Sequence, residues 1–312
     1  MVFGKEGIAV EMIVERGVPA EREAPRRAAS AMEKLPRPPR FVLGRVPVDR
    51  ISMDYAAVLM TEALLHRGEL PPLTVVGPNA HLVTMAERDD RFAGAMREAD
   101  LAVPDGISVV MAARLLGEPI PERVTGGDLM ERMCREAEHY GFRVFFLGGL
   151  PGAARMAAFN LRQRYPDLNI CGTYCPPLGF ENDPAEQARM LREIEHSAPD
   201  LLCVAFGAPK QEIWMQENRY LLRVGAILPV GAAFDTQAGL RRRAPQWIQR
   251  LALEWLFRLM SEPRRLGRRY VVGNSQFIFL VLRQWATQTI ERLMQRVEAV
   301  AGPQEPAARE GD

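Results

Sequence analysis

The feature that most constrains the fold is an alternation of short apolar runs with helical patterns. The runs are apolar along nearly their whole length and occupy residues 41–46, 73–76, 101–103, 143–147, 168–172, 201–206 and 226–230. Strands without a polar side are typical of a parallel sheet that helices cover on both faces. We therefore expect an α/β fold with a mostly parallel sheet and helices on both faces.

The pattern changes at both ends of this alternation. Residues 1–40 are rich in Pro, Arg, Glu and Ala and lack periodicity, so we expect a disordered N-terminal segment. Residues 41–252 form the expected α/β domain, 253–300 a helical appendage, and 301–312 a second disordered tail. Cys134 and Cys203 lie in apolar segments and are expected to be core thiols. The pair Cys171 and Cys175 lacks the further ligands that tetrahedral zinc requires.

Charge is concentrated near the appendage. Residues 241–270 contain nine arginines and two acidic residues, although the whole chain has a net charge of only +1. Such a block suits an anionic partner: phosphate, nucleic acid or acidic lipid. The chain has neither a secretory signal pattern nor an apolar run of about 20 residues, so we expect a cytoplasmic protein that does not span the membrane.

The turns that follow the expected strands carry the polar motifs. In a parallel sheet, ligands bind at the carboxyl ends of the strands. Asp105 is the carboxylate that we expect to act chemically, although an Asp between strand and helix is also an ordinary helix cap. Gly148 and Gly149 precede a helix whose amides could hold a diphosphate, or they form a simple tight turn. Glu212, near the start of another helix, would complement the helix dipole.

Several function classes lack their signatures. The chain contains no G-x-G-x-x-G fingerprint and no Tyr-x3-Lys dyad, which disfavours a nucleotide-sugar epimerase or dehydrogenase. It has no aromatic-plus-basic RNA motif, so we expect no nucleic-acid partner. A non-catalytic module that binds anionic surfaces remains open. No D-x-D occurs, so an enzyme acting on nucleotide sugars would neutralise the diphosphate with arginines instead of a metal.

Read in order, the motifs resemble those of the WecG/TagA/CpsF glycosyltransferases, family 26 of the glycosyltransferase classification. The resemblance runs from about Phe41 to Arg283. It rests on the motifs Pro78-Asn79, Pro104-Asp105-Gly106, Arg123-Val124-Thr125-Gly126, Phe206-Gly207-Ala208-Pro209-Lys210-Gln211-Glu212, Gly231-Ala232-Ala233-Phe234-Asp235, Arg243-Ala244-Pro245, and Glu254-Trp255 through Arg258 to Pro263-Arg264-Arg265. It implies a Rossmann-like fold and an inverting, metal-independent transfer that needs no cofactor.

The resemblance also assigns roles to individual residues. Asp105 matches the proposed catalytic base, Asn79, Arg123 and Gln211 match other pocket residues, and Asp235 matches a nucleotide contact. The implied appendage arginines, which close over the active site and touch the membrane, are Arg258, Arg265 and Arg268. One departure stands at Gly77, where many family members have Thr.

The implied substrates are a UDP-sugar donor and a sugar on undecaprenyl diphosphate as acceptor. Compatible donors carry N-acetylmannosamine, its uronic acid or glucose, and the products belong to teichoic-acid-like, cell-surface or exopolysaccharide synthesis. Apolar side chains stand beside arginines in the appendage, a composition that suits the membrane interface. They are Trp247, Trp255, Phe257, Trp285 and residues 277–282. A helical subdomain with buried aromatics is the alternative. We expect a peripheral protein on the inner face of the plasma membrane, with self-association possible.

Overall fold

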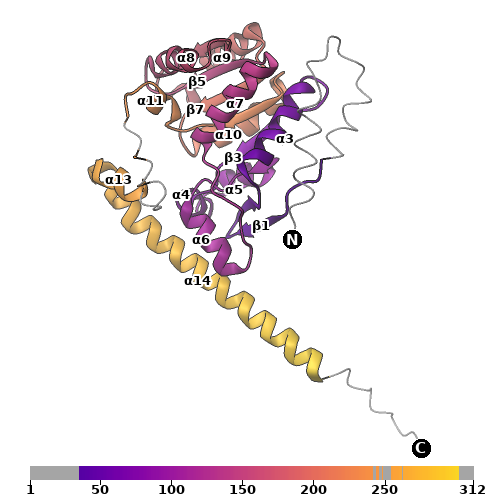
Figure 1. The fold of residues 1–312 in the computed structure, drawn as a ribbon. Coiled ribbons are helices and arrows are strands. Elements are labelled where there is room, and N and C mark those ends of the chain that lie inside the picture. The colour runs from indigo at the N-terminus through magenta and orange to yellow at the C-terminus, as the bar shows by residue number, and fades with distance from the viewer. Residues whose placement is uncertain (1–34, 242–243, 246–247, 249–253, 262, 302–312) are drawn as a thin grey trace, which may run out of the picture.

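The expected parallel sheet is confirmed. The computed structural model describes residues 35–241, 244–245, 248, 254–261 and 263–301. Within them, six strands form a wholly parallel sheet in the order β4-β3-β8-β7-β5-β6 (Figure 1). In chain order these strands are β3 (Leu73–Val76), β4 (Leu101–Ala102), β5 (Arg143–Gly148), β6 (Asn169–Tyr174), β7 (Leu201–Ala205) and β8 (Ala226–Pro229). Their carboxyl ends share one edge of the sheet.

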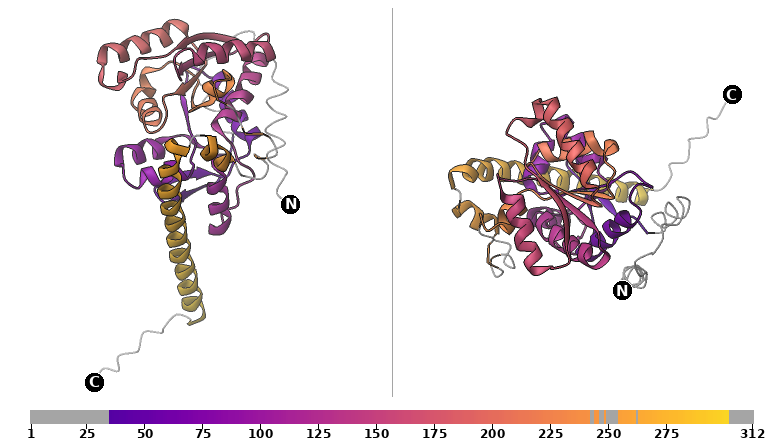
Figure 2. Two further views of the ribbon diagram at one scale, coloured as in Figure 1. Left: turned by 90° about the vertical axis from the view of Figure 1, so that its left-hand side faces the viewer. Right: turned by 90° about the horizontal axis from the view of Figure 1, so that it is seen from above.

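Helices cover both faces of the sheet (Figure 2). One face packs against α3 (Met53–Leu65), α7 (Gly126–Tyr140) and α8 (Ala153–Arg164). The other packs against α9 (Pro184–Ser197) and α10 (Lys210–Asn218). Neighbours along a strand point to opposite faces, so Phe145 packs with α9 and α10 while Phe146 packs with α7 and α8. Burial on both faces explains why the strands are apolar at consecutive positions.

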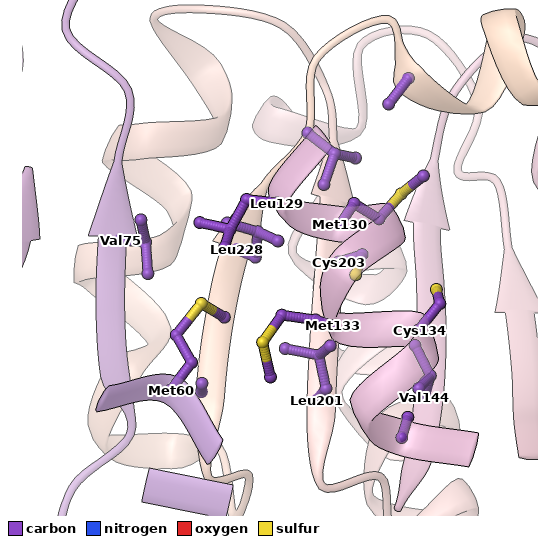
Figure 3. Packing of buried hydrophobic residues seen from close by; sticks show 14 of the residues in the cluster. Met60, Val75, Leu129, Met130, Met133, Cys134, Val144, Leu201, Cys203 and Leu228 are labelled. Atoms are coloured by element: carbon purple, nitrogen blue, oxygen red, sulfur yellow. The ribbon is translucent and has the colours of Figure 1, made fainter. Parts of the chain in front are cut away.

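Sulfur-containing side chains fill much of the core between the sheet, α3 and α7. Met60, Met133 and Cys134 meet the strand residues Cys203 and Leu228 there (Figure 3). The prediction that Cys134 and Cys203 are core thiols is confirmed, since neither has any exposed surface. Burial raises the pKa of Cys134 to about 12, so this thiol is inert at neutral pH.

One predicted strand is wrong. Residues 41–46 form parts of an antiparallel hairpin, β1 (Arg40–Leu43) and β2 (Val46–Asp49), because Gly44 turns the chain with φ +60°. After β3 the chain forms two helices, α4 (Ala80–Ala86) and α5 (Asp90–Glu98), because Asp89 caps the second. Helix α8 begins at Ala153, because Gly152 occupies the cap with φ 80°.

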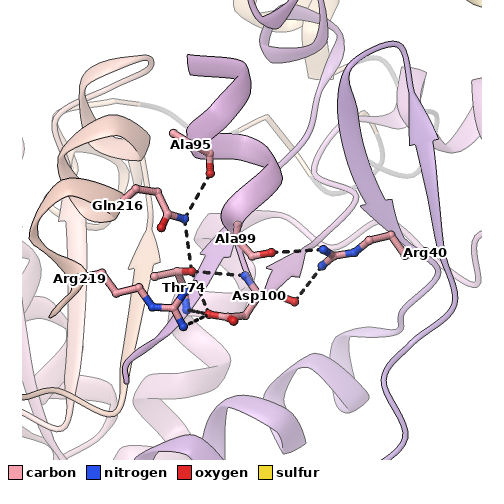
Figure 4. Close-up of polar contacts among 7 residues, drawn as sticks. All are labelled: Arg40, Thr74, Ala95, Ala99, Asp100, Gln216 and Arg219. Atoms are coloured by element: carbon pink, nitrogen blue, oxygen red, sulfur yellow. Dashed lines mark hydrogen bonds and ion pairs between the residues drawn. The ribbon is translucent and has the colours of Figure 1, made fainter. Parts of the chain in front are cut away.

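The carboxylate of Asp100 fastens the opposite, amino-terminal edge of the sheet. Its Oδ2 accepts hydrogen bonds from the Thr74 amide (2.9 Å) and hydroxyl (3.0 Å) and pairs with Arg219 Nη2 at 2.7 Å (Figure 4). The carbonyl oxygen of Asp100 accepts a bond from Arg40 Nη2 at 2.8 Å. This cluster joins β3, the start of β4, the end of α10 and β1.

The C-terminal part is helical, as predicted. After α11 (Ala233–Gln237) come α13 (Glu254–Ser261) and the 39-residue α14 (Pro263–Ala301), which runs across the domain and projects beyond it (Figure 1). Phe277, Leu280 and Val281 bury one face of α14 against α4 and α6 (Ile107–Leu116). The Gln284 amide grips the β1–β2 hairpin: Oε1 accepts from the Gly44 amide at 3.0 Å, and Nε2 donates to the Val42 carbonyl at 2.8 Å.

Other expectations about the chain ends are not tested. The disorder expected at residues 1–40 and 301–312 falls almost wholly outside the described residues. Residues 35–40 are described, and the Pro39 carbonyl accepts a bond from the Arg50 amide at 2.8 Å. Among the helices that the structure describes, none combines the length and apolar character needed to cross a bilayer.

Replacing Asp100 with Ala should destabilise the fold by about 1–3 kcal/mol, because the Thr74 amide and the Arg219 guanidinium would lose their part-buried acceptor. Urea denaturation followed by circular dichroism measures this free energy of unfolding. Asp90→Ala is the matched control: its carboxylate, 90% exposed, pairs with Arg45 at the surface, so its loss should cost less than about 1 kcal/mol. Equal effects of the two substitutions would contradict the role given to Asp100.

Candidate active site

The predicted site residues lie in a row along the carboxyl edge of the sheet. In spatial order, the strand ends carry Asp105 after β4, Asn79 after β3, Asp235 after β8, Gln211 after β7, and Gly148 and Gly149 at the end of β5. Neighbouring strands are about 4.8 Å apart, so these five strand ends span about 20 Å. Residues that are far apart in the sequence thus lie next to one another along one edge of the sheet.

Asn79 and Asp105 are in direct contact. Asn79 caps α4, and its Oδ1 accepts from the amides of His81 (3.1 Å) and Leu82 (3.2 Å). This fixes the orientation of the side-chain amide, because only its oxygen can accept. Nδ2 therefore faces Asp105 and donates to Oδ2 at 3.2 Å. Asp105 is half-buried, and its carboxylate is held toward the edge of the sheet by this bond.

Asp105 is not the cap of the helix that follows it. The cap position of α6 belongs to Gly106 and has no side-chain hydrogen bond. The interpretation of Asp105 as the cap residue of α6 is therefore wrong. The backbone is instead fixed through Pro78, whose carbonyl accepts from the amides of Asp105 (3.1 Å) and Gly106 (3.3 Å).

Glycine allows the two turns to approach this closely. A Cβ at Gly106 would lie 2.9 Å from Asn79 Cβ and 3.1 Å from its Cα, closer than such atoms can pack. At Gly77, the position where the resemblance leads one to expect Thr, a Cβ would lie 3.3 Å from Asp105 Cβ. The residue at position 77 therefore borders the carboxylate, and here it adds no side chain.

Arg123 belongs to a segment wedged between two strand ends. The amide of Val124 donates to the Pro104 carbonyl at 3.0 Å, beside Asp105. A Cβ at Gly126 would lie 2.8 Å from the Pro229 carbonyl oxygen, at the end of β8. Thr125 between them caps α7 by accepting from the Asp128 amide at 3.1 Å. The motif thus places the half-buried Arg123 next to the turn that carries Asp105.

The glycine turn and Asp235 hold each other. Gly148 and Gly149 have φ +96° and +83°, and the Gly149 amide donates to the Ala205 carbonyl at 2.9 Å. The next amide, of Leu150, donates to Asp235 Oδ1 at 3.3 Å. These amides are engaged within the protein, so a diphosphate at this turn would have to meet other donors. The nucleotide contact expected for Asp235 stays a prediction.

Asp235 also holds the first arginine of the basic block. Its Oδ2 pairs with Arg241 Nε at 3.2 Å, and its carbonyl oxygen accepts from the Arg241 amide at 3.1 Å. Asp235 is 6% exposed, and its carboxylate ties the segment after α11 to the carboxyl edge. The chain that leads to the appendage therefore departs from the site itself.

Gln211 and Glu212 point inward from the first turn of α10. Gln211 Oε1 accepts from the Gly207 amide at 3.1 Å, and its Nε2 donates to Glu212 Oε1 at 2.8 Å. Glu212 stands in the first turn of α10, where a glutamate is expected for dipole reasons, but its side chain is buried and the residue is only 1% exposed. Burial raises the pKa of its carboxyl to about 7, because the charged form loses its hydration.

The appendage arginines are placed only through their backbone. Arg258 lies on α13, and Arg265 and Arg268 lie on the first part of α14; their side chains are outside the described part of the structure. Helix α13 lies below α11 and to the left of α4 in Figure 1. Among the described residues, no group of three or more His, Cys, Asp or Glu side chains is arranged to hold a metal ion.

Comparison with known proteins agrees with this geometry. The profile of the glycosyl transferase WecG/TagA/CpsF family matches residues 41–291. The chain belongs to this family. One similar curated protein is the N-acetylglucosaminyldiphosphoundecaprenol N-acetyl-beta-D-mannosaminyltransferase of Bacillus spizizenii, 32% identical over 67% of this chain and 78% of its own length. A protein of the same name from Staphylococcus aureus is 29% identical over 63% of this chain and 75% of its own length.

This chain is therefore a glycosyltransferase of the WecG/TagA/CpsF family, as the resemblance implied. The residue that sequence reasoning missed is Glu212. It stands inside the quoted motif that ends in Lys210-Gln211-Glu212, so a signal was present. Its burial does not follow from the sequence, because a glutamate in the first turn of a helix normally faces water.

Replacing Gly106 with Ala should lower the rate of sugar transfer at least about tenfold, because the new methyl group would push Asn79 away from Asp105. Gly94→Ala on α5 is the control, since a Cβ there meets nothing within 4 Å. It should leave the rate unchanged and raise the melting temperature slightly through helix propensity. Steady-state kinetics and thermal unfolding measure the two effects. Wild-type rates for Gly106→Ala would contradict the close approach.

Proposed function

We propose that this glycosyltransferase moves N-acetylmannosamine from its UDP conjugate to the N-acetylglucosamine of an undecaprenyl-diphosphate-linked acceptor, with inversion and without metal. The observation that carries the proposal is the contact between Asn79 and Asp105 at the carboxyl edge of a sheet whose family is known. The printed names of the two relatives supply the donor and acceptor. The uronic acid and glucose are the alternative donor sugars, and family membership disfavours an epimerase, a dehydrogenase or a non-catalytic module.

Asp105 is the proposed general base. The acceptor hydroxyl is a poor nucleophile, so a carboxylate within hydrogen-bond reach takes its proton while the oxygen attacks the anomeric carbon. The bond from that carbon to the UDP oxygen breaks with its electron pair, and attack from the opposite side inverts the configuration. Asn79 supports this role because its Nδ2 occupies one oxygen, Oδ2, and so orients the carboxylate.

The leaving UDP needs positive charge. We assign this to Arg258, Arg265 and Arg268 of α13 and α14, with Arg123 beside the Asp105 turn. Guanidinium groups keep their charge and grip phosphate with two parallel bonds. The sequence has no D-x-D pair to present a metal to the diphosphate, which supports neutralisation by arginine.

Asp105→Asn should lower kcat about 10²–10⁴-fold, because the amide cannot accept the proton, while UDP binding persists. Glu118→Gln, just beyond the far end of α6, is the matched control and should behave as wild type; its carboxylate lies at the surface and pairs with Arg50 at 3.2 Å. The assay follows UDP release from UDP-N-acetylmannosamine, its uronic acid and UDP-glucose, with and without a synthetic polyprenyl-diphosphate N-acetylglucosamine, with EDTA present.

Acceptor-dependent release from UDP-N-acetylmannosamine in EDTA supports the donor, the acceptor and metal independence together. Release that requires added Mg²⁺ would overturn metal independence alone. Turnover by Asp105→Asn close to wild type would overturn its role as base.

The exposed face of α14 supports a location at the membrane surface. Opposite the buried Phe277, Leu280 and Val281, the helix carries large apolar side chains that are 41–68% exposed. They are Ile278, Phe279, Leu282, Trp285, Ile290, Leu293 and Met294. Exposed apolar side chains of this kind suit the membrane interface, where they can face the acyl chains. We propose that this face, with the preceding arginine block, holds the enzyme beside its lipid-linked acceptor on the inner leaflet.

Changing Phe279, Leu282 and Leu293 together to Ser should reduce binding to vesicles that contain phosphatidylglycerol at least about tenfold, because apolar contact with the lipid is lost. Met156→Ser with Phe159→Ser on α8 is the control, since both side chains are about half exposed but far from α14 in the chain. Vesicle sedimentation measures binding. Loss of vesicle binding in both variants, or in neither, would contradict the proposal. Concentration-dependent self-association without lipid would contradict it too, because a second copy of the chain would then cover this face.

A further inference from the structure

Glu212 is a buried carboxylate for which the proposed mechanism has no use. It is the third residue of α10, which begins where β7 reaches the carboxyl edge, and it is 1% exposed. Burial of a carboxyl group is unfavourable unless bonds replace its lost hydration. It does not cap the helix, because the cap position of α10 makes no side-chain hydrogen bond. A leucine or methionine would pack there at less cost, so the carboxyl group needs another explanation.

Its contacts are directed to one neighbour. Glu212 Oε1 accepts from Gln211 Nε2 at 2.8 Å, whereas Oε2 has no hydrogen-bond partner among the described residues. Gln211 Oε1 is in turn held by the Gly207 amide at 3.1 Å. The glutamine amide is therefore clamped at both ends: its oxygen toward the turn after β7, its nitrogen toward Glu212.

The clamp decides what Gln211 can offer to a substrate. An amide group can rotate by half a turn at little cost unless its two ends meet different partners. Here the Gly207 amide requires the oxygen and Glu212 requires the nitrogen, so only one orientation satisfies both. Nε2 has two hydrogens, and the bond to Glu212 uses one. The second hydrogen then has a fixed direction, on a residue that is 7% exposed and stands in the first turn after β7.

We propose that Glu212 is a positioning residue that holds the Gln211 amide so that its second N–H donates to the sugar nucleotide. The proposal rests on the substrate-binding role expected for Gln211 in the proposed function. Glu212 itself touches no substrate and acts through its neighbour. Burial raises the pKa of the Glu212 carboxyl to about 7, so both protonation states occur near neutral pH. Each state keeps an oxygen that can accept the Gln211 N–H.

Kinetic analysis of Glu212→Met and Glu212→Gln tests this role with UDP-N-acetylmannosamine and the polyprenyl-diphosphate N-acetylglucosamine acceptor. Glu212→Met keeps the volume but removes the acceptor atom, so kcat/KM for the donor should fall about 10- to 100-fold. Glu212→Gln restores an acceptor oxygen and should recover most of that loss. Asn218→Leu removes another buried polar group from α10, at its far end, and should change kcat/KM less than about twofold.

A double-mutant cycle separates positioning from structural support. If Glu212 acts only through Gln211, then Gln211→Leu combined with Glu212→Met loses no more activity than Gln211→Leu alone. Effects that multiply, or wild-type kinetics of Glu212→Met, would overturn the proposal, and so would a Glu212→Gln variant as slow as Glu212→Met. If Gln211→Leu keeps the wild-type kcat/KM, then Gln211 does not bind substrate, and it is the proposed function of Gln211 that is contradicted. Thermal unfolding of each variant confirms that the compared proteins are folded.

Discussion

Burial of the sheet on both faces is the constraint on which the rest of the structure depends. A strand that packs against helices on either side has little room for polar side chains along its length, as the opposite orientations of Phe145 and Phe146 illustrate. Polar side chains therefore gather where the strands begin and end. The amino-terminal edge uses its polar groups for cohesion around Asp100, and the carboxyl edge uses them for the site. One packing rule thus divides structural from functional residues.

Much of this division could be predicted from the sequence. Apolar runs without alternation predict a parallel sheet. Because ligands bind at the carboxyl ends of such strands, the turns that carry Asn79 and Asp105 are candidate site segments from the sequence alone. The hairpin at Gly44 was missed, because two short strands joined by a tight turn look like one run. The break before α5 does not follow from the sequence, because Asp89 could equally be a surface residue inside one longer helix.

Which side chains are buried at the site and on α14 could not be predicted, because this depends on where each side chain points and not on its residue type. A glutamate in the first turn of a helix usually faces water, and only the packing of α10 turns Glu212 inward. Helix α14 is a second example. Its apolar residues surround the helix, and the sequence does not say which of them meet α4 and α6 and which remain outside. Tertiary contacts, made between residues far apart in the chain, decide both cases.

Asn79 divides its side chain between two tasks, and the division has an evolutionary consequence. Its oxygen completes the first turn of α4 and its nitrogen orients Asp105. Aspartate or serine could replace the oxygen but would present no N–H of the same kind to Asp105, and aspartate would add a second negative charge beside it. Any substitution therefore changes folding, chemistry or both. Selection for stability and selection for turnover act on this position together, so neither can relax while the other persists.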